Sequence, residues 1–265
     1  PRMTQDIRTL SDDSFEGRGP GTAGETKTVA YLTEQLRKAG VRPGGELVNG
    51  KRQWTQRVPL LQSDWTGDPI FTLQGERVAG RLAQGTDIAV RAPLTGQREV
   101  RLDNAPLVFA GFGTQAPERQ WDDFKGEDVR GKILVVFVND PDFDGPLADG
   151  STPFGGKAMT YYGRWTYKYE QAAKLGAAGV MIVHEDAPAS YGWATVKNSN
   201  TNSMFDVVRA NPGAVHTPFE SWISKTTAER LFAAAGMTFE QAKAAARSRD
   251  FRPVALPARF SATGT

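Results

Sequence analysis

The stretch KILVVFV, residues 132–138, is an uninterrupted apolar run apart from its leading lysine. Such a run predicts a β-strand buried on both faces, because a half-exposed strand would alternate apolar and polar side chains. Residues 160–175 follow as a predicted helix that Gly176 closes, and GVMIV, residues 179–183, is a second buried strand. Strand, helix and strand in this order predict a crossover unit.

The sequence around this unit has the texture of a β domain. Short extended runs separated by glycine and proline occur at residues 70–73, 87–90 and 106–112. This spacing predicts an otherwise antiparallel domain into which the crossover is built. The Ala-rich residues 226–247 predict helix, whereas residues 189–213 are polar and are expected to be irregular.

The N-terminal 45 residues are predicted to be helical. The segment that follows, residues 46–63, has one possible strand at residues 54–60. GRGPGTAGE, residues 17–25, fits the dinucleotide fingerprint G-x-G-x-x-G. That motif needs a strand before it, which is missing here, and the related P-loop needs a lysine where Glu25 stands. Thr22 and Glu25 instead predict a capping box at the start of a helix. Gly40 is placed to close that helix.

Composition excludes several classes of function. The 265-residue chain carries 32 basic and 30 acidic residues, a net charge of +2, with no basic stripe of the kind that binds nucleic acid. No apolar run approaches the roughly 18 residues that span a membrane. The chain has no cysteine, so disulfides, thiolate zinc sites and cysteine nucleophiles are excluded together.

The two histidines of the chain do not form a recognisable catalytic motif. His184, in His184-Glu185-Asp186, follows a buried strand, where α/β proteins often place functional groups. His216 reads as an ordinary loop residue. Neither H-E-x-x-H nor G-x-S-x-G is present, so the sequence offers no zinc-protease helix and no nucleophile elbow.

An acidic run offers a possible cation site. Asp140, Asp142 and Asp144 fit D-x-D-x-D-G, the first half of a calcium loop. The twelfth position, which should be a bidentate Glu, is Ser151. The sequence therefore leaves two interpretations open, a solvated turn and a calcium site.

Aromatic residues gather in two places, at Tyr161, Tyr162 and Trp165 and again at Tyr191 and Trp193. A helix buries at most one face, so several of these rings are expected near the surface, where aromatic patches often mark contact surfaces. The alternative is that some of them are core residues.

Two stretches carry a family resemblance. FEGRGPGTAGE (15–25), with the helix after it, resembles the N-terminal part of co-catalytic di-zinc aminopeptidases. APLVFAGFG (105–113), WDDFKG (121–126), GKI (131–133) and AAKLGAAGVMIV (172–183) follow in the order found in the protease-associated (PA) domain inserted into many of those peptidases.

The resemblance implies an α+β fold with three parts. Residues 1–63 would be an N-terminal helical segment that packs on a peptidase domain, residues 64–257 a PA domain with flanking helices and the strand-helix-strand crossover, and residues 258–265 the start of the return to the catalytic domain. The zinc ligands and catalytic Glu of the family lie in that further domain. No catalytic or zinc residue is therefore carried onto this chain, which is expected to be inactive alone.

The implied role is to shape substrate access or to contact partners in an exported, periplasmic or secreted enzyme. Residues 154–165 and 189–204 are the segments expected to face the active site, with Asn198 among them and Arg18 as a weaker candidate. The expected partners are the catalytic domain of the same polypeptide and the peptide substrate, with no nucleic acid and no membrane. The alternative is an autonomous, calcium-dependent module that binds a protein or peptide.

Overall fold

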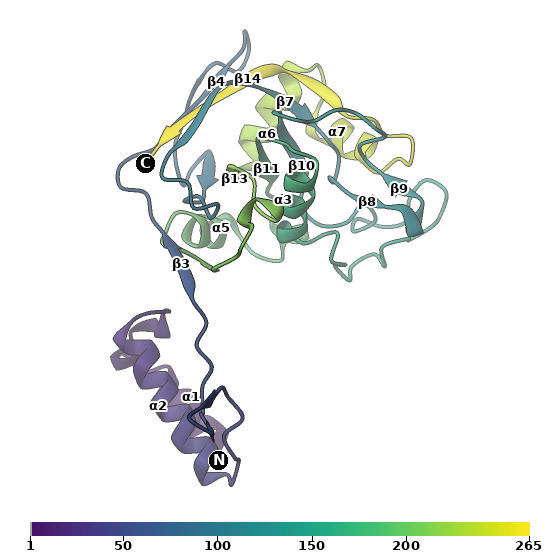
Figure 1. The fold of residues 1–265 in the computed structure, drawn as a ribbon. Helices are drawn as coiled ribbons and strands as arrows, with labels where there is room; N and C mark the ends of the chain where they lie inside the picture. Colours follow the sequence, from purple (N-terminus) through teal and green to yellow (C-terminus); the bar gives the residue numbers. More distant parts are fainter. Residues whose placement is uncertain (1) are drawn as a thin grey trace. The chain divides into compact units, whose positions relative to one another are not determined.

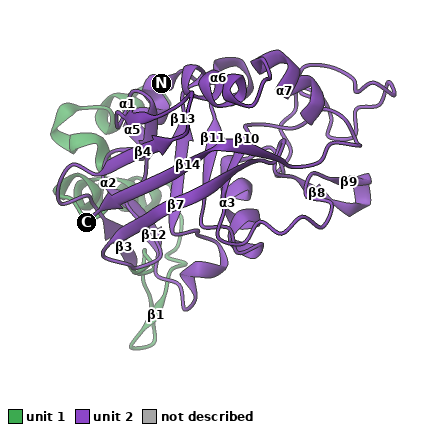
Figure 2. Ribbon diagram, turned by 90° about the horizontal axis from the view of Figure 1, so that it is seen from above, with its two compact units in different colours: residues 1–59 green, residues 60–265 purple. Residues whose placement is uncertain are grey.

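The structure, a computed structural model, describes residues 2–265 and contains two compact units. Unit 1 ends at Pro59 and unit 2 runs from Leu60 to Thr265 (Figure 2). The division falls a few residues before the boundary expected from the sequence. No helix among the described residues is both long and apolar enough to cross a membrane.

Unit 1 is mainly helical (Figure 1). Its elements, with η for a 3₁₀ helix, are α1 (Arg2–Leu10), η1 (Asp13–Arg18), α2 (Ala23–Lys38), β1 (Leu47–Val48) and β2 (Lys51–Arg52).

Unit 2 contains the remaining elements. Its strands are β3 (Leu60–Ser63), β4 (Ile70–Gln74), β5 (Gly80–Leu82), β6 (Ile88–Val90), β7 (Val100–Phe109), β8 (Gln115–Ala116), β9 (Trp121–Asp122), β10 (Ile133–Phe137), β11 (Gly179–Val183), β12 (Met204–Val207), β13 (Phe219–Ile223) and β14 (Val254–Gly264). Its helices are η2 (Pro117–Arg119), α3 (Trp165–Lys174), α4 (Asp186–Ala189), α5 (Trp193–Asn200), η3 (Pro212–Ala214), α6 (Lys225–Ala234) and α7 (Phe239–Ala246).

The first glycine-rich loop starts a helix, as the sequence predicts. The Thr22 hydroxyl accepts the N–H of Glu25, and the Glu25 carboxylate accepts the N–H of Gly21 at 2.6 Å rather than that of Thr22. At the other end Gly40 has φ +76°, and the N–H of Val41 bonds back into α2. These contacts satisfy the orphan backbone groups at both ends of α2.

Among the described residues of unit 1, no hydrophobic side chain is fully buried. Of the α2 residues only Gly24 is buried. A Cβ at this position would come within 2.1 Å of the Phe15 carbonyl oxygen, so the close contact requires glycine. The apolar residues of the predicted stripe, Val29, Leu32 and Leu36, are between 37% and 45% exposed. An unpaired apolar stripe of this kind is typical of a helix that packs on something else.

Unit 2 is built on an eight-stranded mixed sheet in the order β5-β4-β14-β7-β10-β11-β13-β6. The strands β7, β10, β11 and β13 are mutually parallel. The strands that flank them pair antiparallel to their neighbours. These are β14, β4 and β5 on one side and β6 on the other. The predicted β10-α3-β11 crossover is present, but the expectation of an otherwise antiparallel domain is wrong, since the parallel core has four strands.

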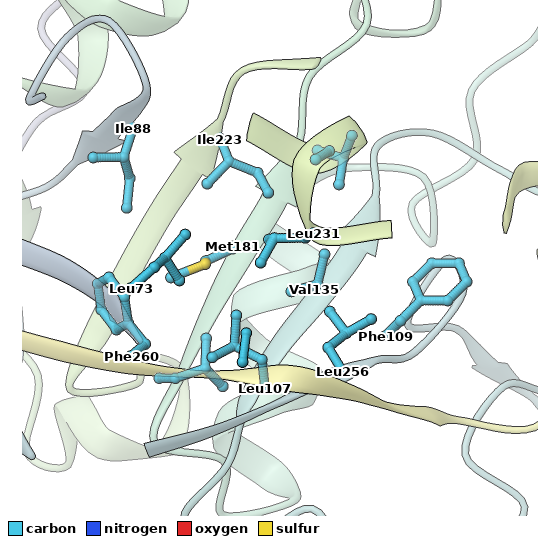
Figure 3. Packing of buried hydrophobic residues seen from close by; sticks show 14 of the residues in the cluster. Leu73, Ile88, Leu107, Phe109, Val135, Met181, Ile223, Leu231, Leu256 and Phe260 are labelled. Carbon is cyan, nitrogen blue, oxygen red and sulfur yellow. The ribbon is translucent and has the colours of Figure 1, made fainter. Parts of the chain in front are cut away.

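The central strand β10 is buried on both faces, as its sequence predicts. Ile133, Val135 and Phe137 belong to the core cluster that includes α6 and α7. The alternate residues Leu134 and Val136 belong to the cluster that includes α3. Figure 3 shows the first cluster. Side chains of successive strand residues point to opposite faces, so one apolar run serves two cores.

The strand β14 completes the sheet between β4 and β7. Residues 258–265 were expected to leave the domain, but residues 258–264 form the C-terminal part of β14, and Phe260 is fully buried. At the end of β14 the Thr265 carbonyl accepts the N–H of Thr66 at 2.7 Å. Thr66, near the start of unit 2, therefore lies beside the residue that follows β14.

Three segments differ from the sequence expectation. Residues 189–213 are not irregular but contain α5 and β12, and β12 pairs with β3. Residues 226–247 form two helices, separated at Gly236 with φ +77°. Most of residues 54–60 is not strand, since β3 begins only at Leu60.

Candidate functional site

The glycine-containing segment AGFG, residues 110–113, folds around one buried carboxylate, Asp123. Asp123 accepts the backbone N–H groups of Phe112 and Thr114 at 3.1 and 2.9 Å and the indole N–H of Trp121 at 2.9 Å. Burial raises the pKa of Asp123, while these donors and nearby Lys168 oppose that rise. The segment is thus held in place by a carboxylate inside the fold.

The acidic run of the possible calcium loop does not come together. Asp140 accepts both the N–H and the hydroxyl of Thr160, at 2.7 and 2.9 Å. Asp142 accepts the N–H of Phe154, and Asp144 pairs with Lys243 at 2.6 Å.

These carboxylates therefore serve protein partners of their own. Within residues 2–265 no three His, Cys, Asp or Glu side chains are grouped so that they could hold a metal ion. The calcium expectation has no support in the structure, and the side chains present also do not fit a zinc site.

His184 lies at the carboxyl end of β11 inside an aromatic enclosure. Its Nε2 is 2.9 Å from an Asp186 oxygen. The rings of Tyr191, Trp193 and Trp222 lie around it, with centroids 5.7 to 6.1 Å away. Two of the predicted contact residues thus pack around a histidine that is 4% exposed.

The other predicted contact residues lie in different places. Tyr161 and Tyr162 donate their hydroxyls to Glu170 and Glu118 at 2.6 and 2.8 Å. Asn198 is exposed on α5. The tyrosines are therefore fixed by hydrogen bonds, and they do not join the enclosure around His184.

Arg18 belongs to unit 1. Its backbone is left-handed, with φ +61°, and its guanidinium donates to the Leu10 carbonyl. This contact ties η1 to the end of α1.

Trp165 forms a wall of a cavity of about 180 Å³. The guanidinium of Arg91, which follows β6, lies 4.8 Å from the Trp165 ring centroid and 5.5 Å from that of Tyr169. Other lining residues come from β12 and the segment after η3, including Phe205 and His216.

Alternating charges connect the walls of this cavity. Arg91 Nη1 lies 2.9 Å from Glu220 Oε2, and Glu220 Oε1 lies 2.9 Å from His216 Nδ1. His216 Nε2 is 3.0 Å from Asp206 Oδ2, and the same carboxylate pairs with Arg209 at 2.9 Å. This series of ion pairs connects the end of β6 to β13 through Arg91 and Glu220, and β13 to β12 through His216.

His216 is held between two carboxylates. Burial acts to lower its pKa, but the hydrogen bonds and charges of Glu220 and Asp206 outweigh burial and raise the pKa above 6.5. His216 lies in a loop, as expected from the sequence, but its two carboxylate partners were not expected. Asp206 and Glu220 lie 10 and 4 residues from His216 in the sequence, but Arg91, which pairs with Glu220, is 129 residues away from it, so no local motif predicts the whole cluster.

Comparisons with known proteins give a weak likeness in fold. No protein-family profile matches the sequence, and no curated protein does. Two similar solved structures are an aminopeptidase from Aneurinibacillus sp. strain AM-1 and BSAP, a zinc aminopeptidase from Bacillus subtilis. The first is 18% identical over 99% of this chain with a TM-score of 0.39, the second 17% over 97% with a TM-score of 0.32. The chain spans 42% of the length of either structure.

Proposed function

We propose that this chain is the N-terminal and PA-type portion of a zinc aminopeptidase, in which it shapes the access of peptides to a catalytic domain or binds a partner. The reaction of such an enzyme is the metal-assisted hydrolysis of the N-terminal peptide bond. Zinc would be held in the catalytic domain, and no step of zinc chemistry is assigned to residues 2–265. By the same resemblance, the enzyme would be exported to the periplasm or secreted.

The observation that carries the proposal is the closure of unit 2. The N–H and hydroxyl of Thr66 both bond to the carbonyl of Thr265, 199 residues away in sequence. A domain in which a segment near its start lies beside its last strand can be inserted at one point of a host fold without disturbing it. This is the arrangement that the sequence resemblance implies for a PA domain.

Unit 1 supports the same proposal independently. Its apolar stripe, Val29, Leu32 and Leu36, is exposed along α2. Each such side chain would contribute about 1–2 kcal/mol if it were buried against a neighbour. A catalytic domain of the same polypeptide is the neighbour that we propose.

The residues proposed to act on substrate access are Tyr162 and Trp193. Both are anchored, Tyr162 through Glu118 and Trp193 through its indole N–H to the Gly85 carbonyl at 3.0 Å. Anchored aromatic rings lose little conformational entropy when a peptide packs on them.

Two experiments test the proposal. The purified chain, dialysed and then supplied with Zn²⁺, should not hydrolyse leucine p-nitroanilide above the buffer rate. Two zinc ions retained per chain, or zinc-dependent hydrolysis by the chain itself, would overturn the proposal.

The second experiment uses a polypeptide that joins the chain to a catalytic domain. There Tyr162→Ala combined with Trp193→Ala should change the relative kcat/KM among peptides of different length. The matched control is Val208→Ala, an exposed apolar residue of unit 2. Unchanged relative kcat/KM values in the double variant would show that Tyr162 and Trp193 do not control substrate access.

A further inference from the structure

The cavity beside Trp165 is lined by an arginine whose guanidinium is only partly hydrogen-bonded. Arg91 is 8% exposed, and its Nε has no hydrogen-bond partner among the described residues. Among the described residues, the guanidinium of Arg91 has one side-chain acceptor, Glu220, which binds Nη1. A buried polar group left unpaired is costly, so native structures rarely keep one without a reason.

The carboxylates around the cavity are already engaged. Glu220 serves Arg91 and His216, and Asp206 serves His216 and Arg209. Glu170 accepts the Tyr161 hydroxyl. These side chains therefore provide no further acceptor for Arg91, and an acceptor that reaches its guanidinium from the cavity would be a water molecule or a ligand.

Part of the lining is apolar and largely aromatic. Trp165 and Tyr169 lie against the guanidinium, and Phe205, Leu94 and Val215 also line the cavity, together with the polar residues Thr166 and Arg209. Flat apolar walls beside a fixed guanidinium suit a flat apolar body with an anionic group at one end, because the guanidinium edge matches the two oxygens of a carboxylate.

We propose that this cavity binds a small carboxylic acid with a flat apolar body, whose carboxylate accepts hydrogen bonds from Arg91 and whose body packs between Trp165 and Phe205. The binding mode does not depend on the proposed peptidase role. It uses the cluster around His216 as a scaffold that holds Arg91 in place through Glu220.

The test uses benzoate as the probe, followed by NMR of the ¹⁵N-labelled chain and by calorimetry. Benzoate should saturate the chain with a Kd on the order of 1 mM or tighter, a range typical of a single-ring ligand. Benzamide, with the same ring and no charge, should bind at least about tenfold more weakly. The shifted resonances should include the Trp165 indole N–H.

Two variants and one control locate the site. Arg91→Lys keeps a cation beside Glu220 but removes the guanidinium edge, and should weaken benzoate binding about tenfold or more. Val215→Phe fills the cavity without touching the ion pair and should also prevent binding. Arg81→Lys, on the exposed edge of β5, should bind like the wild type.

Benzoate that fails to bind at about tens of millimolar would overturn the proposal. So would equal binding of benzoate to the wild type and to Val215→Phe, a comparison that holds even if Arg91→Lys does not fold. Equal affinities for benzoate and benzamide would also contradict it, because the carboxylate would then have no role.

Discussion

The clearest prediction concerns His216, which joins β12 to β13 through two carboxylates. A protonated imidazole donates to Glu220 and Asp206 at once, whereas a neutral imidazole can donate to only one of them. In the variant His216→Gln, glutamine keeps a polar side chain of similar length but has no charge and carries its donors on one nitrogen, so it cannot donate to the two carboxylates from opposite sides. The variant should therefore lose the connection between the two strands at low pH.

The structure sets the size of the effect. A hydrogen bond to a charged group contributes about 1.5–3 kcal/mol. Glu220 retains Arg91 and Asp206 retains Arg209, so neither carboxylate is left without a cation. We therefore expect His216→Gln to lower the free energy of unfolding of unit 2 by about 2 kcal/mol near pH 5.5.

The pH dependence follows from the direction of the pKa shift. The pKa of His216 is raised in the folded state above its ordinary 6.5. The stabilisation is then fully present below the unfolded-state pKa and is lost as the pH rises through the folded-state pKa. The difference between wild type and variant should shrink steadily from pH 6.5 upward.

Urea denaturation followed by tryptophan fluorescence measures this difference at a series of pH values. Asp123 and Lys168 share no hydrogen bond with His216, so their titration should cancel between the two proteins. An NMR titration of the His216 ring gives its pKa directly. A stability difference that is constant or grows with pH, or a ring pKa below 6.5, would refute the reasoning.

Three further predictions concern other parts of the chain. Asp123→Ala leaves three buried donors without an acceptor and should cost about 3–6 kcal/mol in urea denaturation; a loss under about 1 kcal/mol would contradict the role given to this carboxylate. Gly179→Ala places a Cβ 2.6 Å from the Phe219 carbonyl oxygen and should cost about 1–3 kcal/mol, whereas a neutral effect would show that β11 and β13 can separate. Calcium should leave the Tm unchanged, since Asp140 and Asp144 already have partners; a rise in Tm that EDTA reverses would restore the calcium interpretation.

The sequence predicts those elements whose stability is encoded locally. Residues 132–138 and 179–183 are strands because both of their faces are apolar, and α2 begins and ends at its own capping residues. The strand β12 was not predicted because its stability comes from β3, which lies more than 140 residues earlier. Local polarity in that segment gave no sign of the pairing.

The candidate cavity shows the same limit. Trp165 belongs to an aromatic cluster that is visible in the sequence. Arg91 and Glu220 are 129 residues apart, and only the pairing of β6 with β13 brings them together. A charged residue in isolation is usually a solvated one, so their burial as a pair could not be read from composition.

The pairing of β3 with β12 also has a mechanical consequence. Any tension on unit 1 enters unit 2 through β3, a four-residue strand held by one neighbour in a two-stranded ribbon. Tension on the other end loads β14, which has a neighbour on each side. Under load the chain would therefore yield first at β3, lengthening the connection between the units while the eight-stranded sheet stays whole.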